Sequence, residues 1–167
     1  MKHLYKFFFL FLLLSMQGCG IYSFTGGSVG NAKTLKIPFF PNNASFVEPS
    51  LSQKFTFALQ DKFLQQTNLS LTKGTADLIF EGEIVQYRIS PIAATADQIA
   101  SKSRLTISVK VWFYNRLKEE DNYEKTFSHF YDYGSNTQLI GSELESVYQE
   151  IFERITQDIF NEALAKW

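Results

Sequence analysis

Residues 104–115, RLTISVKVWFYN, alternate apolar and polar side chains without interruption. Consecutive side chains of a strand point to opposite faces of a sheet, so this alternation predicts a half-buried strand. Its apolar face is formed by Leu105, Ile107, Val109, Val111 and Phe113. We therefore expect one face of a sheet to pack against a core and the other face to be free.

Three further segments are predicted to be strands of the same sheet. Residues 34–40 are rich in apolar side chains, but Pro38 cannot donate a ladder hydrogen bond, which favours an edge position. Residues 77–89 change the phase of their alternation near Ile84, so we expect a β-bulge there. Residues 123–133 return after a charged hairpin loop, and Phe127, Tyr131 and Tyr133 share the apolar face.

Two segments have helical spacing instead. Residues 51–66 carry an apolar stripe with one large side chain every four residues, and Ser50 with Gln53 matches a capping box. A long helix is predicted at the end of the chain, where Ser142 with Glu145 forms a second capping box. Its apolar stripe contains Leu144, Val147, Tyr148, Ile151, Ile155, Ile159 and Ala163.

The predicted order of elements is thus strand, helix, three strands, helix. The simplest packing is an α+β fold in which both helices cover one face of a four-stranded, mostly antiparallel sheet. Residues 34–167 are enough for a single domain with a sizeable core.

The N-terminus has the layout of a secretory signal peptide. Lys2 and Lys6 precede a run of Phe and Leu that is too short to span a bilayer. The sequence around Gly18 and Cys19 resembles a lipobox, although Gln17 departs from the usual pattern. We therefore expect residues 1–18 to be removed, Cys19 to be acylated, and residues 19–33 to form a lipidated tether.

The composition narrows the functional classes. The chain has a formal net charge of −1, which is not typical of a general nucleic-acid binder. Cys19 is its only cysteine, and His129 is the only histidine after the signal peptide, so neither a disulfide nor a zinc site is expected. No motif for a nucleotide or another cofactor is present.

One motif near the N-terminus has the pattern of a catalytic serine. Residues 26–30, GGSVG, match the G-x-S-x-G pattern around a nucleophilic serine, which requires a strand before it and a helix after it. Ser28 instead precedes a predicted strand, and nothing places His129 near it. Glu81 and Glu83 share one face of a strand, where solvated carboxylates are the simpler interpretation. We expect no enzyme.

The free face of the sheet is the candidate binding surface. It would carry Arg104, Lys110, Trp112 and Tyr114, with Lys102 and Tyr87 beside them. Cations interleaved with aromatic side chains suit a polyanionic amphiphile or a protein partner. An ordinary solvated sheet face is the alternative.

The mature sequence resembles the LPS-assembly lipoprotein family LptE, in its Bacteroidetes-type version. The resemblance lies in CGIYSFTG (19–26), IPFFPNN (37–43), LSQKFT (51–56), LTISVKV (105–111), and the ending from Asp158 to Trp167. It covers essentially the whole mature chain, and no single motif in it is diagnostic.

The resemblance implies a non-enzymatic outer-membrane lipoprotein with an α/β sandwich fold. Members partner and plug the LptD β-barrel and help to place lipopolysaccharide in the outer leaflet. Gly20 after the acylated cysteine favours the outer membrane, and we expect the periplasmic side. The alternative is a stand-alone periplasmic lipoprotein that binds a hydrophobic ligand in a pocket between helices and sheet.

Overall fold

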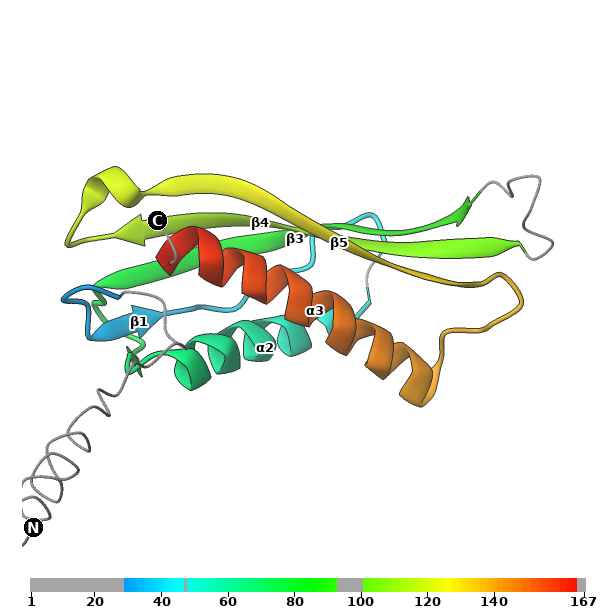
Figure 1. Ribbon diagram of the computed structural model, residues 1–167, viewed down its shortest axis with the longest axis horizontal. Coiled ribbons are helices and arrows are strands. Elements are labelled where there is room, and N and C mark those ends of the chain that lie inside the picture. Colours follow the sequence, from blue (N-terminus) through cyan, green and yellow to red (C-terminus); the bar gives the residue numbers. More distant parts are fainter. Residues whose placement is uncertain (1–28, 47, 93–100, 165–167) are drawn as a thin grey trace, which may run out of the picture.

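A single mixed sheet runs the length of the molecule, and two helices lie side by side on one of its faces (Figure 1). The computed structural model describes residues 29–46, 48–92 and 101–164. The strands have the order β2-β1-β3-β4-β5. Their bounds are β1 (Thr34–Lys36), β2 (Ser70–Leu71), β3 (Leu78–Ile92), β4 (Lys102–Asn115) and β5 (Tyr123–Gly134), and the helices are α2 (Leu51–Gln66) and α3 (Gly141–Leu164). The predicted α+β class with both helices on one face is confirmed.

The antiparallel strands β3, β4 and β5 form most of the sheet. The register between β3 and β4 shifts between Ile84 and Gln86, which confirms the predicted bulge. After the bulge Tyr87 pairs with Ile107, so the side chain of Tyr87 lies on the helix-covered face. A short 3₁₀ helix, η2 (Glu119–Asp121), lies in the hairpin between β4 and β5.

The N-terminal strand differs from its prediction. β1 ends at Lys36 and pairs in parallel with β2 on one side and β3 on the other, so it is not at an edge. Pro38 lies beyond the paired residues and removes no ladder bond. The true edge is β2, a two-residue fifth strand that sequence reasoning missed. Because the strand ends early, Phe39 is exposed while Phe40 is fully buried.

Both helices occur where their apolar stripes predict them. Leu51, Phe55, Leu59 and Phe63 of α2 are completely buried. The two predicted capping boxes are absent, because the Ser50 hydroxyl donates to Glu48 and Glu145 instead pairs with Lys54 of α2. No helix in the described part of the chain is both long and apolar enough to cross a membrane.

The segment after β1 packs tightly onto β3. The ring of Phe40 lies so close to Gly82 that a Cβ at this glycine would be 2.3 Å from the Phe40 Cε1 atom. The Phe40 N–H donates to the buried Thr56 hydroxyl in α2, at 3.1 Å. Phe40 therefore links α2 to the middle of the sheet, and only glycine at position 82 leaves room for its ring.

Candidate functional site

The side of β3, β4 and β5 turned away from the helices is the candidate site, and we call it the open face. All five residues proposed for it from the sequence lie there, because they occupy alternate positions of β4. These residues are Lys102, Arg104, Lys110, Trp112 and Tyr114. Tyr87 does not join them: it faces the helices, and its hydroxyl lies 3.2 Å from that of Tyr148.

Arg104 is held by a carboxylate and an aromatic ring of the neighbouring strand β5. Its Nε and Nη2 atoms donate to the two carboxylate oxygens of Asp132 at 2.6 and 2.8 Å. Its guanidinium carbon lies 3.6 Å from the centre of the Phe130 ring, a cation–π contact. These hydrogen bonds hold the pKa of Asp132 below its usual value and raise the pKa of Arg104. The guanidinium is thereby fixed in one orientation.

Lys110 has a similar arrangement nearer the other end of β4. Its ammonium lies 2.5 Å from the Glu124 carboxylate and 5.0 Å from the centre of the Trp112 ring. Hydrogen bonds from Lys110 and then from Trp112 lower the pKa of Glu124. Both central cations of the open face thus have a carboxylate partner on β5, so an incoming anion would compete with that carboxylate.

Sequence reasoning missed the contribution of β5 to this face. Glu124, Phe130 and Asp132 alternate with the apolar residues of β5, and the register places Asp132 opposite Arg104 and Glu124 opposite Trp112. The sequence does show that polar residues alternate along residues 123–133. It does not show which residue of β4 each of them lies opposite, because that depends on the register of the two strands. The open face is therefore amphipathic and close to neutral rather than a cationic patch.

The centre of the open face is polar. The Ser108 hydroxyl lies 2.9 Å from the side-chain oxygens of both Gln86 and Ser128, one on each neighbouring strand. Tyr114 is exposed near one end of β4, and Phe130 is exposed toward the other. This alternation of aromatic rings, ion pairs and hydroxyl groups suits contact with another polar protein surface.

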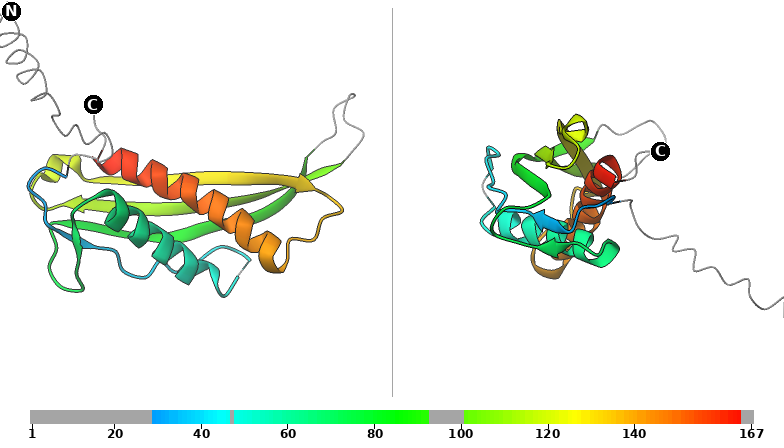
Figure 2. Two further views of the ribbon diagram at one scale, coloured as in Figure 1. Left: turned by 60° about the horizontal axis from the view of Figure 1, so that its bottom comes forward. Right: turned by 90° about the vertical axis from the view of Figure 1, so that its left-hand side faces the viewer.

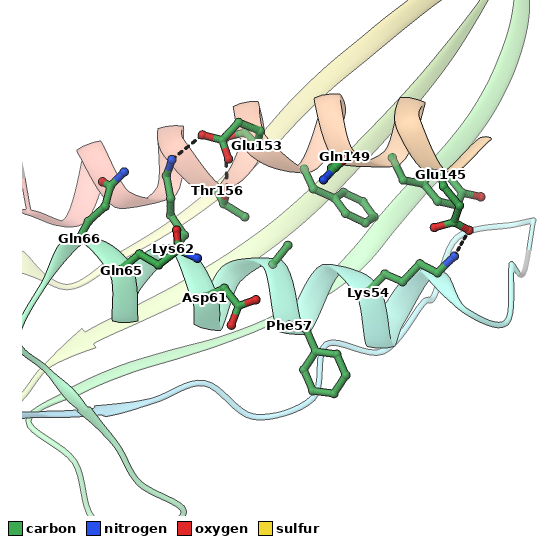
Figure 3. Close-up of a pocket in the computed structure, with 13 residues that line it drawn as sticks. Lys54, Phe57, Asp61, Lys62, Gln65, Gln66, Glu145, Gln149, Glu153 and Thr156 are labelled. Carbon is green, nitrogen blue, oxygen red and sulfur yellow. Dashed lines mark hydrogen bonds and ion pairs between the residues drawn. The ribbon is translucent and has the colours of Figure 1, made fainter. Parts of the chain in front are cut away.

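A separate groove of about 720 Å³ lies between α2 and α3. Figure 3 shows that ion pairs cross it, from Lys54 to Glu145 and from Lys62 to Glu153. Its lining also contains Asp61, Gln65, Gln66 and Gln149. Phe57, Ala58, Tyr148, Phe152 and Thr156 complete the lining. The groove therefore mixes charged, amide and apolar side chains and is not the mostly apolar pocket that a hydrophobic ligand requires.

Not all of the remaining sequence candidates are among the residues that the structure describes. Cys19 and Ser28 lie outside those residues, and the described residues contain no cluster of three potential metal ligands. The His129 Nε2 atom lies 2.7 Å from the Asp158 carboxylate, on the surface between β5 and α3. Glu83 accepts a hydrogen bond from Asn43, and Glu81 lies exposed beside Trp112.

Solved structures resemble this chain at low sequence identity, and one of them, a PelC structure, shares its fold. A PelC dodecamer from Paraburkholderia phytofirmans is 9% identical, with 81% of this chain and 94% of that chain covered and a TM-score of 0.50. The hypothetical protein CT253 from Chlamydia trachomatis is 13% identical, covering 81% and 100%, with a TM-score of 0.48. A minor lipoprotein from Acinetobacter baumannii is 12% identical, covering 80% and 91%, with a TM-score of 0.44.

Comparison at the sequence level identifies the family. No curated protein matches this sequence significantly. The family model described as LptE, Lipopolysaccharide-assembly, matches residues 32–163, which include every strand and nearly all of both helices. The chain therefore belongs to the LptE lipopolysaccharide-assembly family.

Proposed function

We propose that this protein is an outer-membrane lipoprotein that partners and plugs an LptD-type β-barrel during lipopolysaccharide assembly. The observation that carries the proposal is the family match over residues 32–163. In this proposal acylated Cys19 anchors the protein at the periplasmic side, and the domain has no enzymatic role.

The shape and surface of the domain support a plug. Wide membrane barrels enclose a polar interior, and a plug must present polar groups to it. The open face offers paired charges, hydroxyl groups and aromatic rings on regular strands, and its ion pairs are already formed before a partner arrives. We propose that Lys102, Arg104, Lys110, Trp112 and Tyr114 contact the barrel or lipopolysaccharide.

Lipopolysaccharide carries acidic groups that match the cations of this face. Arg104 and Lys110 would exchange a carboxylate for such a group, whereas Lys102 is exposed at the end of β4. We therefore expect binding of lipopolysaccharide to weaken in a variant that combines Arg104→Ala with Lys110→Glu. Unchanged binding by that variant would show that Arg104 and Lys110 do not contact lipopolysaccharide.

A pull-down from native membranes tests the partnership. The tagged, lipidated chain is extracted in mild detergent, and the retained proteins are identified by mass. We expect one large outer-membrane barrel in near-equal amount, and much less of it with Trp112→Glu. Phe57→Glu is the matched control, because Phe57 is an exposed aromatic residue of α2 on the opposite layer.

Recovery of the lipoprotein alone, under conditions that keep other barrel complexes intact, would count against the plug. If Trp112→Glu and Phe57→Glu lowered the amount of recovered barrel equally, the barrel partnership would still hold. The open face would then not be identified as the surface that contacts the barrel. The alternative of a hydrophobic-ligand carrier gains no support from the groove between α2 and α3, because charged and amide side chains dominate its lining.

A further inference from the structure

The β-bulge in β3 brings Arg88 to the open face, where the sequence alternation did not predict it. Before the bulge the odd-numbered residues of β3 pair with open-face residues of β4, and after it the even-numbered residues do. Arg88 therefore pairs with Thr106, and its side chain is exposed. Within the described residues, Arg88 forms no ion pair. The open face thus has a cation whose charge is not matched by a bound carboxylate of the described strands.

Two further cations lie next to Arg88. Arg104 is its diagonal neighbour, because Arg104 precedes Thr106 by two residues of β4, and diagonal neighbours lie roughly 7–8 Å apart. Lys102 lies two residues before Arg104, about 7 Å along the strand. Asp132, which pairs with Arg104, is the one carboxylate beside these cations on the described strands. We call Arg88, Lys102, Arg104 and Asp132 the cationic end, and its three cations and one carboxylate give a formal charge of +2.

The other end of the open face has the opposite charge. There Lys110 is the one cation on the described residues of β3, β4 and β5, and it shares the face with the carboxylates of Glu81, Glu83 and Glu124. This end has a formal charge of −2, so the open face is neutral as a whole but polarised along its length. A polyanion is therefore attracted to the cationic end and repelled from the other end.

The chemistry of the cationic end favours phosphate as the anion. The planar guanidinium of arginine presents paired N–H donors that match a phosphate group, and two neighbouring arginines can bind two sides of it. No hydrogen bond within the described residues engages the guanidinium of Arg88, whereas Asp132 accepts two from Arg104. A phosphate with two negative charges attracts Arg104 more strongly than a carboxylate with one, so it can displace Asp132.

Apolar side chains flank the same cations. Phe130 is 46% exposed, and its ring stacks on the guanidinium of Arg104. Ile92 pairs with Lys102 at the end of β3, which places its side chain on the open face. Free phosphate gains nothing from these apolar groups, whereas a lipid can bury apolar surface against them. The arrangement therefore fits the phosphorylated headgroup of an amphiphile.

The cationic end is remote from the point where the described chain enters the domain. Val29 lines one cavity together with Asn115, the last residue of β4. Lys102 is the first of the 14 residues of β4, so at about 3.3 Å per residue it lies roughly 40 Å from Asn115. Figure 2 shows the adjoining ends of β3 and β4 at the opposite end of the domain from the start of β1. A lipid anchor at Cys19 would thus leave the cationic end facing away from the anchoring leaflet.

We propose that Arg88, Lys102 and Arg104 form a binding site for the phosphorylated headgroup of a lipid, and that Asp132 competes with the phosphate for Arg104. This inference rests on the proposed function, in which that lipid is lipopolysaccharide. It adds Arg88 to the contact and assigns the phosphates of the lipid to one end of the open face.

Binding of fluorescent lipopolysaccharide to the purified full-length chain in non-ionic detergent tests the site. We expect Arg88→Ala to lower the affinity about tenfold, because it removes charge-assisted hydrogen bonds to phosphate. Lipopolysaccharide whose phosphates have been removed should bind the wild type at least about tenfold more weakly, and Arg88→Ala should then cause no further loss.

Arg116→Ala is the matched control. Arg116 is also exposed and forms no ion pair within the described residues, but it lies just beyond the other end of β4. This variant should bind lipopolysaccharide like the wild type. Thermal unfolding of both variants, followed by circular dichroism, shows that each remains folded at the temperature of the binding measurement.

Asp132→Asn tests the competition for Arg104. The substitution keeps the size of the side chain but removes its charge, so we expect lipopolysaccharide to bind about threefold more tightly. If Asp132 served only to hold Arg104 in place, the same variant would bind more weakly. Weaker binding by Asp132→Asn would therefore reject its role as a competitor.

Other results would overturn the site itself. Unchanged binding by Arg88→Ala, or equal losses with Arg88→Ala and Arg116→Ala, would each do so. Displacement of lipopolysaccharide by an equal concentration of inorganic pyrophosphate or of polyglutamate would identify free phosphate or an acidic protein segment as the ligand, and would also overturn the proposal. Unchanged lipid binding by Arg88→Ala together with normal recovery of the barrel in the pull-down would remove this site and leave the proposed function standing.

Discussion

Replacing Gly82 with alanine tests the packing that links α2 to the sheet. An added Cβ would lie 2.3 Å from the Phe40 Cε1 atom and 2.4 Å from the carbonyl oxygen of Lys110. Ordinary contacts of a Cβ begin near 3.4 Å, so both neighbours would have to retreat by about 1 Å. The two neighbours differ in kind, since one is a side chain and the other is backbone.

Neither neighbour can retreat easily. Phe40 is fully buried against Phe55, and its N–H is bonded to Thr56. The Lys110 carbonyl belongs to β4, which is paired on both sides. Overpacking a core typically costs about 1–3 kcal/mol, and we expect the upper end here because backbone must move. A loss of about 3 kcal/mol should lower the melting temperature by roughly 6–12 °C.

Gly74→Ala is the matched control. A Cβ at Gly74 would meet only the Thr72 hydroxyl, at 3.8 Å, so the same substitution should be neutral or stabilise by about 0.5 kcal/mol. Urea unfolding of the purified chain, followed by circular dichroism, measures both variants against wild type. A loss below about 1 kcal/mol for Gly82→Ala would refute the reasoning, because it would show that Phe40 and β4 can rearrange cheaply.

Three further predictions concern polar groups, and each uses equilibrium unfolding. The ammonium of the buried Lys62 lies 2.6 Å from the exposed Glu153 carboxylate. Glu153→Ala should lower the free energy of unfolding by about 1–3 kcal/mol, because it leaves the buried ammonium unpaired. Lys62→Met removes that charge and should change the free energy of unfolding by less than about 1 kcal/mol. A larger loss from Lys62→Met than from Glu153→Ala would contradict this reasoning. The Tyr123 hydroxyl is buried without a hydrogen-bond partner among the described residues, so Tyr123→Phe should be neutral or stabilising, and a clear loss would reveal a missed partner. Hydrogen bonds from the N–H of Lys33 and from the hydroxyl and N–H of Thr34 lower the pKa of Asp77 in the folded protein. Ionised Asp77 therefore stabilises the fold at pH values above its unfolded pKa near 3.8. This stabilisation is lost as the pH falls through the lower folded pKa. Asp77→Asn should therefore lose less stability than wild type between about pH 5 and pH 2, and identical acid profiles would exclude this contribution.

The sequence predicted those parts of the fold that depend on local periodicity. The alternation in residues 104–115 identified β4 and its two faces, and the four-residue spacing from Leu51 to Phe63 identified α2 with its correct ends. The phase change near Ile84 revealed the bulge. These features could be predicted because the side chains of one element alone determine which of its faces is buried.

The signals at the ends of elements did not predict the contacts that the structure shows there. Ser50 with Gln53 has the sequence of a capping box, yet the Ser50 hydroxyl binds Glu48. Glu145 matches a second box, yet it pairs with Lys54 across the helix pair. Pro38 suggested an edge strand, but β1 ends before it and β2 forms the edge. Only Glu145 was taken by a tertiary contact, whereas the partner of Ser50 lies two residues away and the strand simply ends before Pro38.

The sequence by itself determined the fold class, the strands and helices with long regular patterns, and the position of Lys102, Arg104, Lys110, Trp112 and Tyr114 on one face of a strand. Only the tertiary structure decided what those residues touch. Register placed Asp132 and Glu124 beside two of the cations, and strand order left β5 as a long open edge. The physical reason is that alternation within a strand fixes the direction of its side chains, whereas their neighbours depend on how separate strands align.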